Sequence, residues 1–372
     1  MSFENRSPRP PYPTGAARTA TSRPTVRRIA LLIGMLLVAA VYSLFIASSA
    51  RSTAPRSSRL LAASPEPAAR PGIGGGLPAA ERPTGLPVAH TVGLRVITFV
   101  DHTRLARLHH GRIEPRTLVT QIRYPALGSA QADDVPDATP LTASGPFPLV
   151  VFGPGFAETP TIYARLLDAW ARAGYVVAAP SFPLTQKHVP GGRRESDLIN
   201  QPADMSFVIT RMLAENELAA SFLHGLIAPA LVAVAGQSDG AATALAAAYD
   251  PAFADTRIRA AIILSGAELT IIDDEIPFPS HGPALLAAQG SRDTINEPSA
   301  THRYFKLAPR PKFLLSLLGA THLPPYTTQQ PYLGVVQKVT TAFLDHFLKH
   351  EHASLARMRD SGNVAEVATL AG

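Results

Sequence analysis

Residues 236–240, with the sequence Gly-Gln-Ser-Asp-Gly, have the types and spacing best suited to chemistry. An apolar run at 231–235 precedes them, and a helix-forming stretch rich in alanine follows. A serine at such a strand-to-helix turn is lifted clear of both elements, and the turn needs glycine on either side. The N-terminus of the following helix offers free N–H groups to a developing negative charge. This setting favours a nucleophile at Ser238 over an ordinary Gly/Ser turn.

A serine hydroxyl is a weak nucleophile unless a base takes its proton and a carboxylate orients that base. Asp293 follows a predicted strand that runs into a Gly/Ser turn, and His322 directly follows the last predicted strand. Both side chains would therefore lie at the carboxyl edge of a parallel sheet, beside Ser238. His281 precedes a strand and His302 falls within a predicted helix, so neither is placed at that edge. We expect a triad of Ser238, Asp293 and His322.

A tetrahedral intermediate needs two backbone donors for its oxyanion. The N–H of Asp239, the residue after the nucleophile, would supply one. The other would come from the loop at 153–156, which follows the apolar run at 149–152, with Phe156 as the favoured donor.

Short apolar runs alternate with helical segments between residues 91 and 350. Strands are predicted at 92–100, 117–124, 149–152, 175–180, 231–235, 258–264, 284–288 and 312–318. The main helices are predicted at 161–173, 202–220 and 335–348. This alternation predicts an α/β domain at 91–350 with a mostly parallel central sheet and helices on both faces, followed by a C-terminal tail at 351–372. Ligands of such sheets bind outside the carboxyl ends of the strands, where the loops at 181–199 and 266–282 would shape the pocket.

Composition excludes several classes of function. The 372-residue chain has a net charge of +6 and no cysteine. Residues 1–28 hold six arginines and one glutamate, and residues 48–90 hold five arginines and two glutamates, so the predicted domain is slightly acidic. Without a basic stripe on that domain, binding to nucleic acid is not expected. The absence of cysteine excludes disulfides, cysteine nucleophiles and cysteine-based metal sites, and the candidate residues imply no metal or cofactor.

The front of the chain has the pattern of a membrane anchor. Residues 29–47 are uncharged and apolar, and as a helix would span about 28 Å, close to the hydrocarbon thickness of a bilayer. The basic tail at 1–28 is predicted to be disordered and cytoplasmic, the segment at 29–47 to be one transmembrane helix, and the Pro/Ala/Gly-rich segment at 48–90 to be a linker to an extracytoplasmic domain. The alternative is a signal peptide cleaved near the small residues at 48–50, which would release a secreted protein.

Residues 92–348 resemble the α/β hydrolase superfamily, most closely its dienelactone-hydrolase-like, lipase and cutinase-type branch. The resemblance is carried by residues 151–156 (Val-Phe-Gly-Pro-Gly-Phe), 173–177 (Ala-Gly-Tyr-Val-Val), 236–240 and 320–322 (Ala-Thr-His). The Pro-Gly-aromatic loop is similar to that of polyester hydrolases. This similarity implies that Phe156 donates its N–H to the oxyanion and lines the acyl cleft with its ring.

Together these features predict a serine hydrolase that cleaves carboxylic esters through an acyl-enzyme. A small molecule, a lipid or a polyester would fit as substrate. Two alternatives stay open. The same triad could transfer the acyl group to an alcohol, or the domain could be a degenerate hydrolase fold that only binds. Asp239 keeps the second alternative open, because a carboxylate beside a developing oxyanion opposes catalysis unless it points away or is paired.

Overall fold

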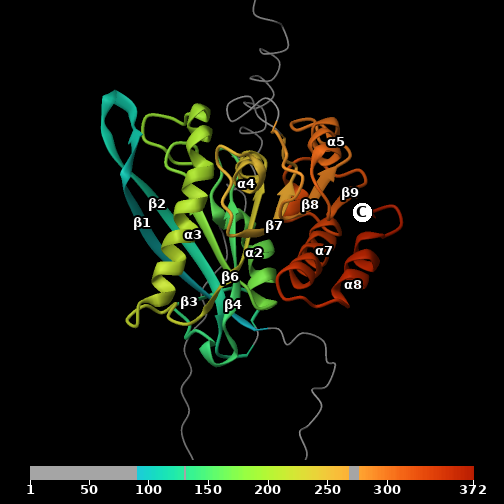
Figure 1. Ribbon diagram of the computed structural model, residues 1–372, viewed down its shortest axis with the longest axis horizontal. Coiled ribbons are helices and arrows are strands. Elements are labelled where there is room, and N and C mark those ends of the chain that lie inside the picture. Colours follow the sequence, from blue (N-terminus) through green and yellow to red (C-terminus); the bar gives the residue numbers. More distant parts are fainter. Residues whose placement is uncertain (1–89, 130, 268–275) are drawn as a thin grey trace, which may run out of the picture. The chain divides into compact units, whose positions relative to one another are not determined.

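The computed structural model describes residues 90–129, 131–267 and 276–372 (Figure 1). The predicted basic tail and membrane anchor lie outside these residues, as does the linker apart from His90. Residues 268–275 of the loop at 266–282 are also outside them. Among the helices that the structure describes, none is both long and apolar enough to cross a membrane. The membrane anchor therefore stays a prediction.

A ten-stranded sheet forms the centre of the described domain, in the order β10-β9-β8-β7-β6-β4-β5-β2-β1-β3. Neighbours from β5 to β9 pair in parallel, whereas β2 joins β5, and β10 joins β9, in antiparallel fashion. The strands are β1 (Thr91–Arg107), β2 (Ile113–Ala126), β3 (Val135–Pro136), β4 (Phe147–Gly153), β5 (Val176–Ser181), β6 (Ile227–Gln237), β7 (Ile258–Leu264), β8 (Ala284–Gly290), β9 (Lys312–Leu317) and β10 (Ala368–Ala371).

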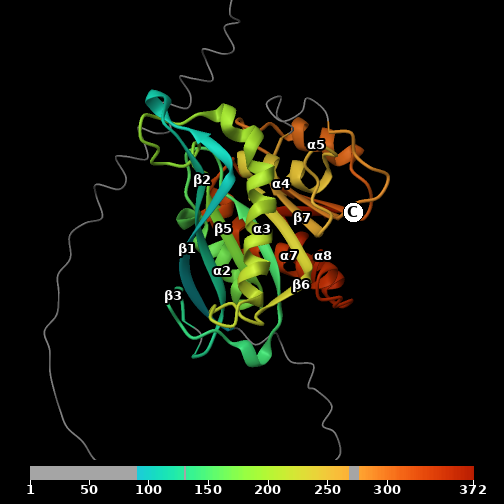
Figure 2. The same cartoon turned by 60° about the vertical axis from the view of Figure 1, so that its left-hand side comes forward.

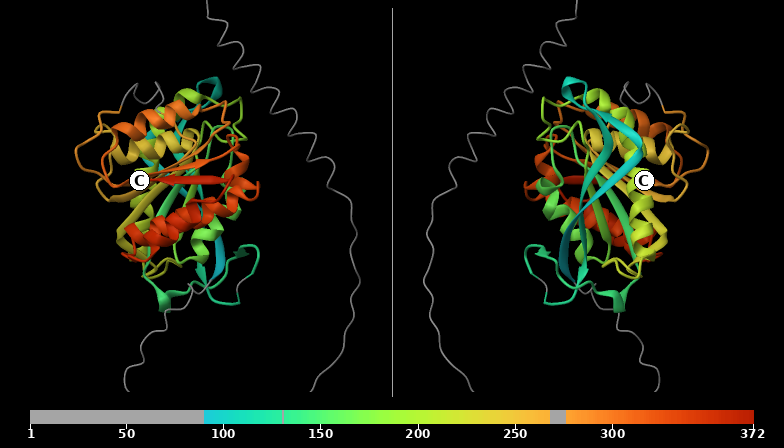
Figure 3. Two further views of the ribbon diagram at one scale, coloured as in Figure 1. Left: turned by 90° about the vertical axis from the view of Figure 1, so that its right-hand side faces the viewer. Right: turned by 90° about the vertical axis from the view of Figure 1, so that its left-hand side faces the viewer.

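Helices cover both faces of this sheet, as Figure 3 shows. Helices α2 (Ala164–Arg172), α7 (Tyr332–Phe347) and α8 (Ser354–Gly362) pack on one face, and α3 (Gln201–Glu217), α4 (Asp239–Tyr249) and α5 (Pro298–Leu307) on the other. The shorter helices are η1 (His109–Gly111), η2 (Thr142–Ser144), η3 (Pro160–Tyr163), η4 (Glu195–Asn200) and α6 (Pro324–Thr327). Strands such as β4 and β8 are buried at every position because helices lie on both sides, which explains their uninterrupted apolar sequences. The predicted α/β architecture is confirmed.

The first two strands are longer than the sequence pattern indicates. Figure 2 shows β1 and β2 as a long ribbon at the edge of the sheet. Their pairing shifts register between Asp101 and Leu105, where the apolar alternation of β1 is interrupted. Asp101 holds this irregular segment, since its carboxylate accepts hydrogen bonds from Thr103 and Arg104. In the sequence, such a break in the apolar alternation looks like the end of a strand, so the pattern predicts strands that are too short.

The prediction of a C-terminal tail at 351–372 is wrong. Helix α8 packs beside α7 with Met358 fully buried, and β10 pairs with β9 from Ala368 to Ala371. Arg357 in α8 also forms an ion pair with Asp345 in α7. The sequence pattern misses these elements because both are short and because their stability comes from tertiary packing rather than from local propensity.

A buried ion cluster fixes the loop between β5 and α3 to the sheet. Arg116 on β2 is 1% exposed and donates hydrogen bonds to Asp197 in η4 and Asp204 in α3, at 2.5–2.9 Å. Burial raises the pKa of Asp204 even though Arg116 and Arg104 lower it. Each charge in the cluster is therefore stabilised by its oppositely charged partners.

We predict that Arg116→Met lowers the free energy of unfolding by about 3–5 kcal/mol, because it leaves the buried Asp197 without its cation and Asp204 with Arg104 alone. Urea denaturation followed by circular dichroism measures this loss. The control is Arg112→Met, which removes an exposed ion pair with Glu114 and is expected to cost at most about 1 kcal/mol. Equal unfolding midpoints for the two variants would contradict the assigned role of the cluster.

Candidate active site

Ser238 occupies the sharp turn between β6, which ends at Gln237, and α4, which begins at Asp239. Its backbone has φ 57° and ψ −123°, and residues with side chains rarely adopt a positive φ of this kind. Holding a residue in such a conformation costs of order 1–3 kcal/mol, so the surrounding structure must impose it. The predicted strand–serine–helix turn is thus present.

Two glycines impose this turn through close backbone contacts. A Cβ atom on Gly240 would overlap the carbonyl group of Gly153 at the end of β4. A Cβ atom on Gly236 would overlap the carbonyl group of Gly240. The start of α4 therefore packs directly against the ends of β4 and β6, which only glycine allows.

The structure brings the three predicted triad residues together from three separate strand ends. Asp293 follows β8, and His322 follows β9. The Nε2 atom of His322 lies 2.8 Å from the Oγ atom of Ser238, and its Nδ1 atom lies 2.8 Å from an Oδ2 oxygen of Asp293. With its proton on Nδ1, the imidazole donates to Asp293 and accepts from the serine hydroxyl. This is the arrangement in which a serine can lose its proton to a base.

The surroundings of Asp293 keep its carboxylate ionised. The residue is buried, and burial by itself would raise its pKa. Hydrogen bonds from the ring of His322 and from the N–H of Ile295 outweigh burial and leave the pKa below its ordinary value. The N–H of Asn296 donates to the same Oδ1 oxygen as Ile295. Asp293 is therefore a fixed negative charge beside the imidazole.

Sequence reasoning missed Gln289, the residue that supports Asp293 from β8. Its Nε2 atom donates to the Oδ2 oxygen of Asp293 at 3.2 Å and to the carbonyl oxygen of Asn296 at 3.0 Å. The hydroxyl of Thr301 in α5 donates in turn to the Oε1 oxygen of Gln289 at 2.6 Å. A single amide in an otherwise apolar strand was the signal that could have revealed it.

The two predicted oxyanion donors lie on segments that contact Ser238. Phe156 is in the turn after β4, and Asp239 is the first residue of α4. A Cβ atom on Gly155 would lie 3.2 Å from the Cβ atom of Ser238, so the Phe156 loop lies directly against the serine. Within the described ranges, neither N–H donates to another group of the protein. Both donors are therefore available to a substrate.

A second unpredicted network joins the oxyanion loop to the histidine loop. The N–H of Gly155 donates to the hydroxyl of Tyr163 at 3.2 Å, and this hydroxyl donates to the Oε1 oxygen of Gln237 at 2.8 Å. The Nε2 atom of Gln237 then donates to the carbonyl oxygen of His322 at 3.1 Å. Tyr163 and Gln237 are both buried, and burial raises the pKa of Tyr163 well above its ordinary value. Gln237, the residue before the nucleophile, thus links the two loops that flank it.

Asp239 is the unusual residue of the site. Its side chain is buried, with 8% of the residue exposed, and its Oδ2 oxygen has no hydrogen-bond partner among the described residues. Burial, reinforced by the charge of Glu195, raises its pKa to about 7. The carboxyl is therefore partly protonated at neutral pH rather than a full negative charge.

Charged side chains lie beside the loop that carries Phe156. Phe156 is partly exposed, and the guanidinium of Arg193 lies 5.8 Å from the centre of its ring. Arg193 belongs to the segment between β5 and η4, so the loop predicted at 181–199 does border the site. Lys187 from the same segment and Arg193 both act electrostatically on Glu158, two residues after Phe156.

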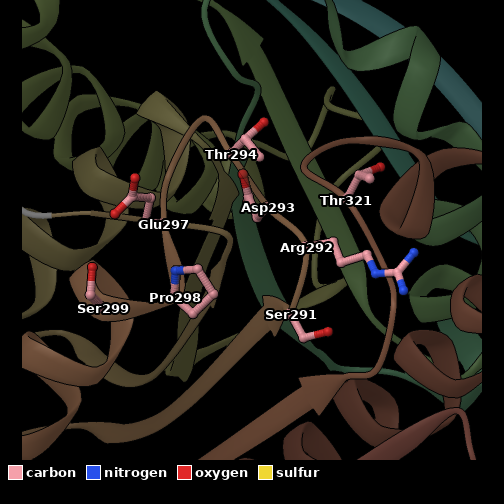
Figure 4. A pocket seen from close by; sticks show the side chains of 8 residues that line it. All are labelled: Ser291, Arg292, Asp293, Thr294, Glu297, Pro298, Ser299 and Thr321. Carbon is pink, nitrogen blue, oxygen red and sulfur yellow. The ribbon is translucent and has the colours of Figure 1, made fainter. Parts of the chain in front are cut away.

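An open hollow of about 730 Å³ lies beside the acid of the triad (Figure 4). Figure 4 shows Glu297 and Ser299 on one side of it and Arg292 and Thr321 on the other. Neither Ser238 nor Phe156 lines it, so this hollow is not the place where an ester carbonyl would meet the nucleophile. Across the ranges that the structure covers, no group of three or more acidic or histidine side chains could hold a metal ion.

Comparison with known proteins supports the fold. No protein-family model matches the chain, and no curated protein sequence matches it. Among solved structures, 635 chains match, so the fold is widespread and does not by itself identify a substrate. One of them, a ferulic acid esterase from Streptomyces cinnamoneus, has a TM-score of 0.53 and 21% sequence identity, covering 70% of this chain and 91% of that chain. The chain is thus similar in its α/β fold to an esterase.

We predict that Tyr163→Phe lowers the free energy of unfolding by about 1–3 kcal/mol, because the buried Gly155 N–H and Gln237 oxygen lose their partner. Tyr332→Phe is the matched control, since its hydroxyl bonds to the Leu318 carbonyl at the surface, where water can replace it. Urea denaturation of both variants measures the difference. Equal stability of the two variants would contradict the network.

Proposed function

We propose that this chain is a serine hydrolase that cleaves carboxylic esters through an acyl-enzyme. The observation that carries the proposal is the continuous contact from Asp293 through His322 to Ser238, with 2.8 Å at each step. The α/β fold that the chain shares with an esterase supports the same class of reaction.

In the first half of the proposed reaction, the Oγ atom of Ser238 attacks the ester carbonyl carbon while its proton passes to Nε2 of His322. The ionised Asp293 stabilises the resulting imidazolium. The carbonyl oxygen becomes an oxyanion, which accepts hydrogen bonds from the N–H groups of Phe156 and Asp239. When the bond to the alcohol oxygen breaks, Nε2 returns its proton to that oxygen, and the alcohol leaves an acyl-serine behind.

The second half repeats these steps with water. A water molecule attacks the acyl carbonyl carbon as Nε2 of His322 takes one of its protons. Collapse of the intermediate breaks the bond to Ser238, whose oxygen recovers the proton from Nε2, and the carboxylic acid is released. The N-terminus of α4 favours negative charge at the oxyanion in both halves.

The state of Asp239 favours hydrolysis over a function in binding alone. A full negative charge beside the oxyanion would oppose its formation. With a pKa of about 7, the carboxyl carries no charge in much of the population at neutral pH and below. Repulsion between the Asp239 carboxylate and the oxyanion therefore opposes catalysis only in the deprotonated fraction of the protein. A module that only binds would also have no need for a triad whose members are held in place by further hydrogen bonds.

We predict that Asp293→Asn lowers kcat for 4-nitrophenyl acetate by about 10⁴-fold with little change in KM, because the amide favours the wrong tautomer of His322. Asp250→Asn is the control, since Asp250 is also buried and also accepts a backbone hydrogen bond, from Ala252, but lies at the other end of α4. Ser238→Ala sets the background rate. An Asp293→Asn variant as active as Asp250→Asn would refute the triad.

A further inference from the structure

The turn that carries Phe156 is held by hydrogen bonds on every side. The N–H of Glu158 donates to the carbonyl oxygen of Gly155 at 3.2 Å, which closes a β-turn with Ala157 at φ 65°. The N–H of Ala157 donates at 2.8 Å to a backbone carbonyl of the loop after β5. The N–H of Gly155 donates to the hydroxyl of Tyr163. Together these bonds fix the peptide unit that bears the Phe156 N–H.

Gln237, the last residue of β6, packs against this turn with its amide oxygen. Its Oε1 atom accepts a hydrogen bond from the Tyr163 hydroxyl at 2.8 Å and so orients the hydroxyl that binds Gly155. A Cβ atom on Gly155 would lie 2.9 Å from the same Oε1 atom, so the turn also touches the amide directly. The amide of Gln237 therefore supports the turn both by contact and through Tyr163.

The other end of the same amide holds the loop of the base. The Nε2 atom of Gln237 donates to the backbone carbonyl oxygen of His322 at 3.1 Å. The ring of His322 in turn contacts Ser238 and Asp293. One planar amide, next to the nucleophile in the chain, thus sets the separation between the oxyanion turn and the base.

An amide is well suited to this bridge. The side chain must accept a hydrogen bond from a hydroxyl and donate one to a carbonyl oxygen, whereas a hydrocarbon does neither and an ionised carboxylate only accepts. Gln237 is 1% exposed and Tyr163 is 0% exposed, so solvent does not replace a lost partner. Residues 231–236 before Gln237 are apolar or glycine. The polar side chain at the last position of β6 therefore serves the bridge and not a contact with solvent.

We propose that Gln237 is a positioning residue, which holds the Phe156 N–H and the imidazole of His322 in register with Ser238. The inference rests on the proposed function and adds to it a group that touches no reacting atom. Proton transfer and oxyanion stabilisation require groups within about 0.5 Å of their productive positions. An oxyanion forms and His322 moves a proton in both halves of the reaction, so loss of the amide would slow both.

The first test is Gln237→Met in the full-length protein, which keeps the length of the side chain and removes both hydrogen bonds. We expect kcat for 4-nitrophenyl acetate to fall by about 10²-fold, because the oxyanion donor and the base are no longer held together. KM should change little, since formation and hydrolysis of the acyl-enzyme slow together. A Gln237→Met variant with the kcat of the wild type would overturn the inference.

The matched control is Asn216→Leu. Asn216 in α3 is also a buried amide, and its Oδ1 atom accepts a hydrogen bond from the N–H of Ile227 at 2.7 Å. Ile227 is the first residue of β6 and Gln237 the last, so the two amides support opposite ends of one strand. Urea denaturation should show that both variants lose stability, whereas kcat should fall only in Gln237→Met. An equal fall of kcat in both variants would overturn the positioning role.

Gln237→Glu tests the two hydrogen bonds with a side chain of the same shape. When protonated, the carboxyl accepts from Tyr163 and donates to the His322 carbonyl as the amide does, and when ionised it only accepts. Burial raises the pKa of such a carboxyl, so the neutral form is present at mildly acidic pH. The ratio of the variant's kcat to that of the wild type should therefore rise toward one as the pH is lowered to about 5.5.

The titratable groups around this side chain are the same in both proteins. Tyr163 faces it from η3, and Glu158 and Asp239 act electrostatically on Tyr163 from the oxyanion turn and from α4. His322 faces it from the loop after β9. Dividing by the wild-type kcat at each pH removes the titration of these groups. The acidic end decides, because an ionised carboxylate would also repel the oxyanion, and a ratio there as low as in the apolar variant would overturn the inference.

A double variant tests the path through Tyr163. Tyr163→Phe removes the link between Gln237 and the Gly155 N–H but leaves the bond to His322. Residues that act through one network have effects on the barrier that do not add. The double variant should therefore lose less kcat than the product of the two single losses, and losses that multiply would overturn the shared path.

The outcomes separate this inference from the proposed function. Wild-type protein that hydrolyses 4-nitrophenyl acetate, with Gln237→Met equally active, would overturn the inference and leave the esterase in place. Wild-type protein that hydrolyses no ester would remove the proposed function and the inference with it.

Discussion

The close packing of α4 against the ends of β4 and β6 is the constraint on which the rest of the site depends. Gly240 meets the Gly153 carbonyl and Gly236 meets the Gly240 carbonyl at distances that leave no room for a side chain. This packing holds Ser238 at φ 57° and presents the N-terminus of α4 to the same point. The loop after β4 then lies against the serine, with Gly155 at the contact. One contact between backbones thus positions the nucleophile, the dipole of α4 and the backbone donors.

Much of the fold and the three triad candidates could be predicted from the sequence, because each depends on local patterns. Ser238, Asp293 and His322 each follow a short apolar strand, and the ends of parallel strands meet at one edge of a sheet. Neither Tyr163 nor Gln289 could be assigned a role in this way. Tyr163 bonds to a residue 74 positions away, and such a pairing leaves no trace in local periodicity. The helix and strand after residue 350 were missed because tertiary packing stabilises them.

Asp239 shows what can be inferred from the sequence and what only the structure adds. In the sequence, Asp239 stands out because an acidic residue directly follows the nucleophile, and sequence analysis counts it as a negative charge. Burial changes that assessment, because desolvation raises its pKa to about 7 and leaves one oxygen without a protein donor. A carboxyl at this position is compatible with an oxyanion only because it is buried.

The central claim is that His322 and Asp293 activate Ser238. The most direct measurement is the reaction of the full-length protein with a fluorophosphonate, which forms a stable bond with an activated serine and loses fluoride. Intact-mass spectrometry and peptide mapping should show one adduct, on Ser238, and none in Ser238→Ala. A folded protein that forms no adduct, or that forms it at another serine, would contradict the account.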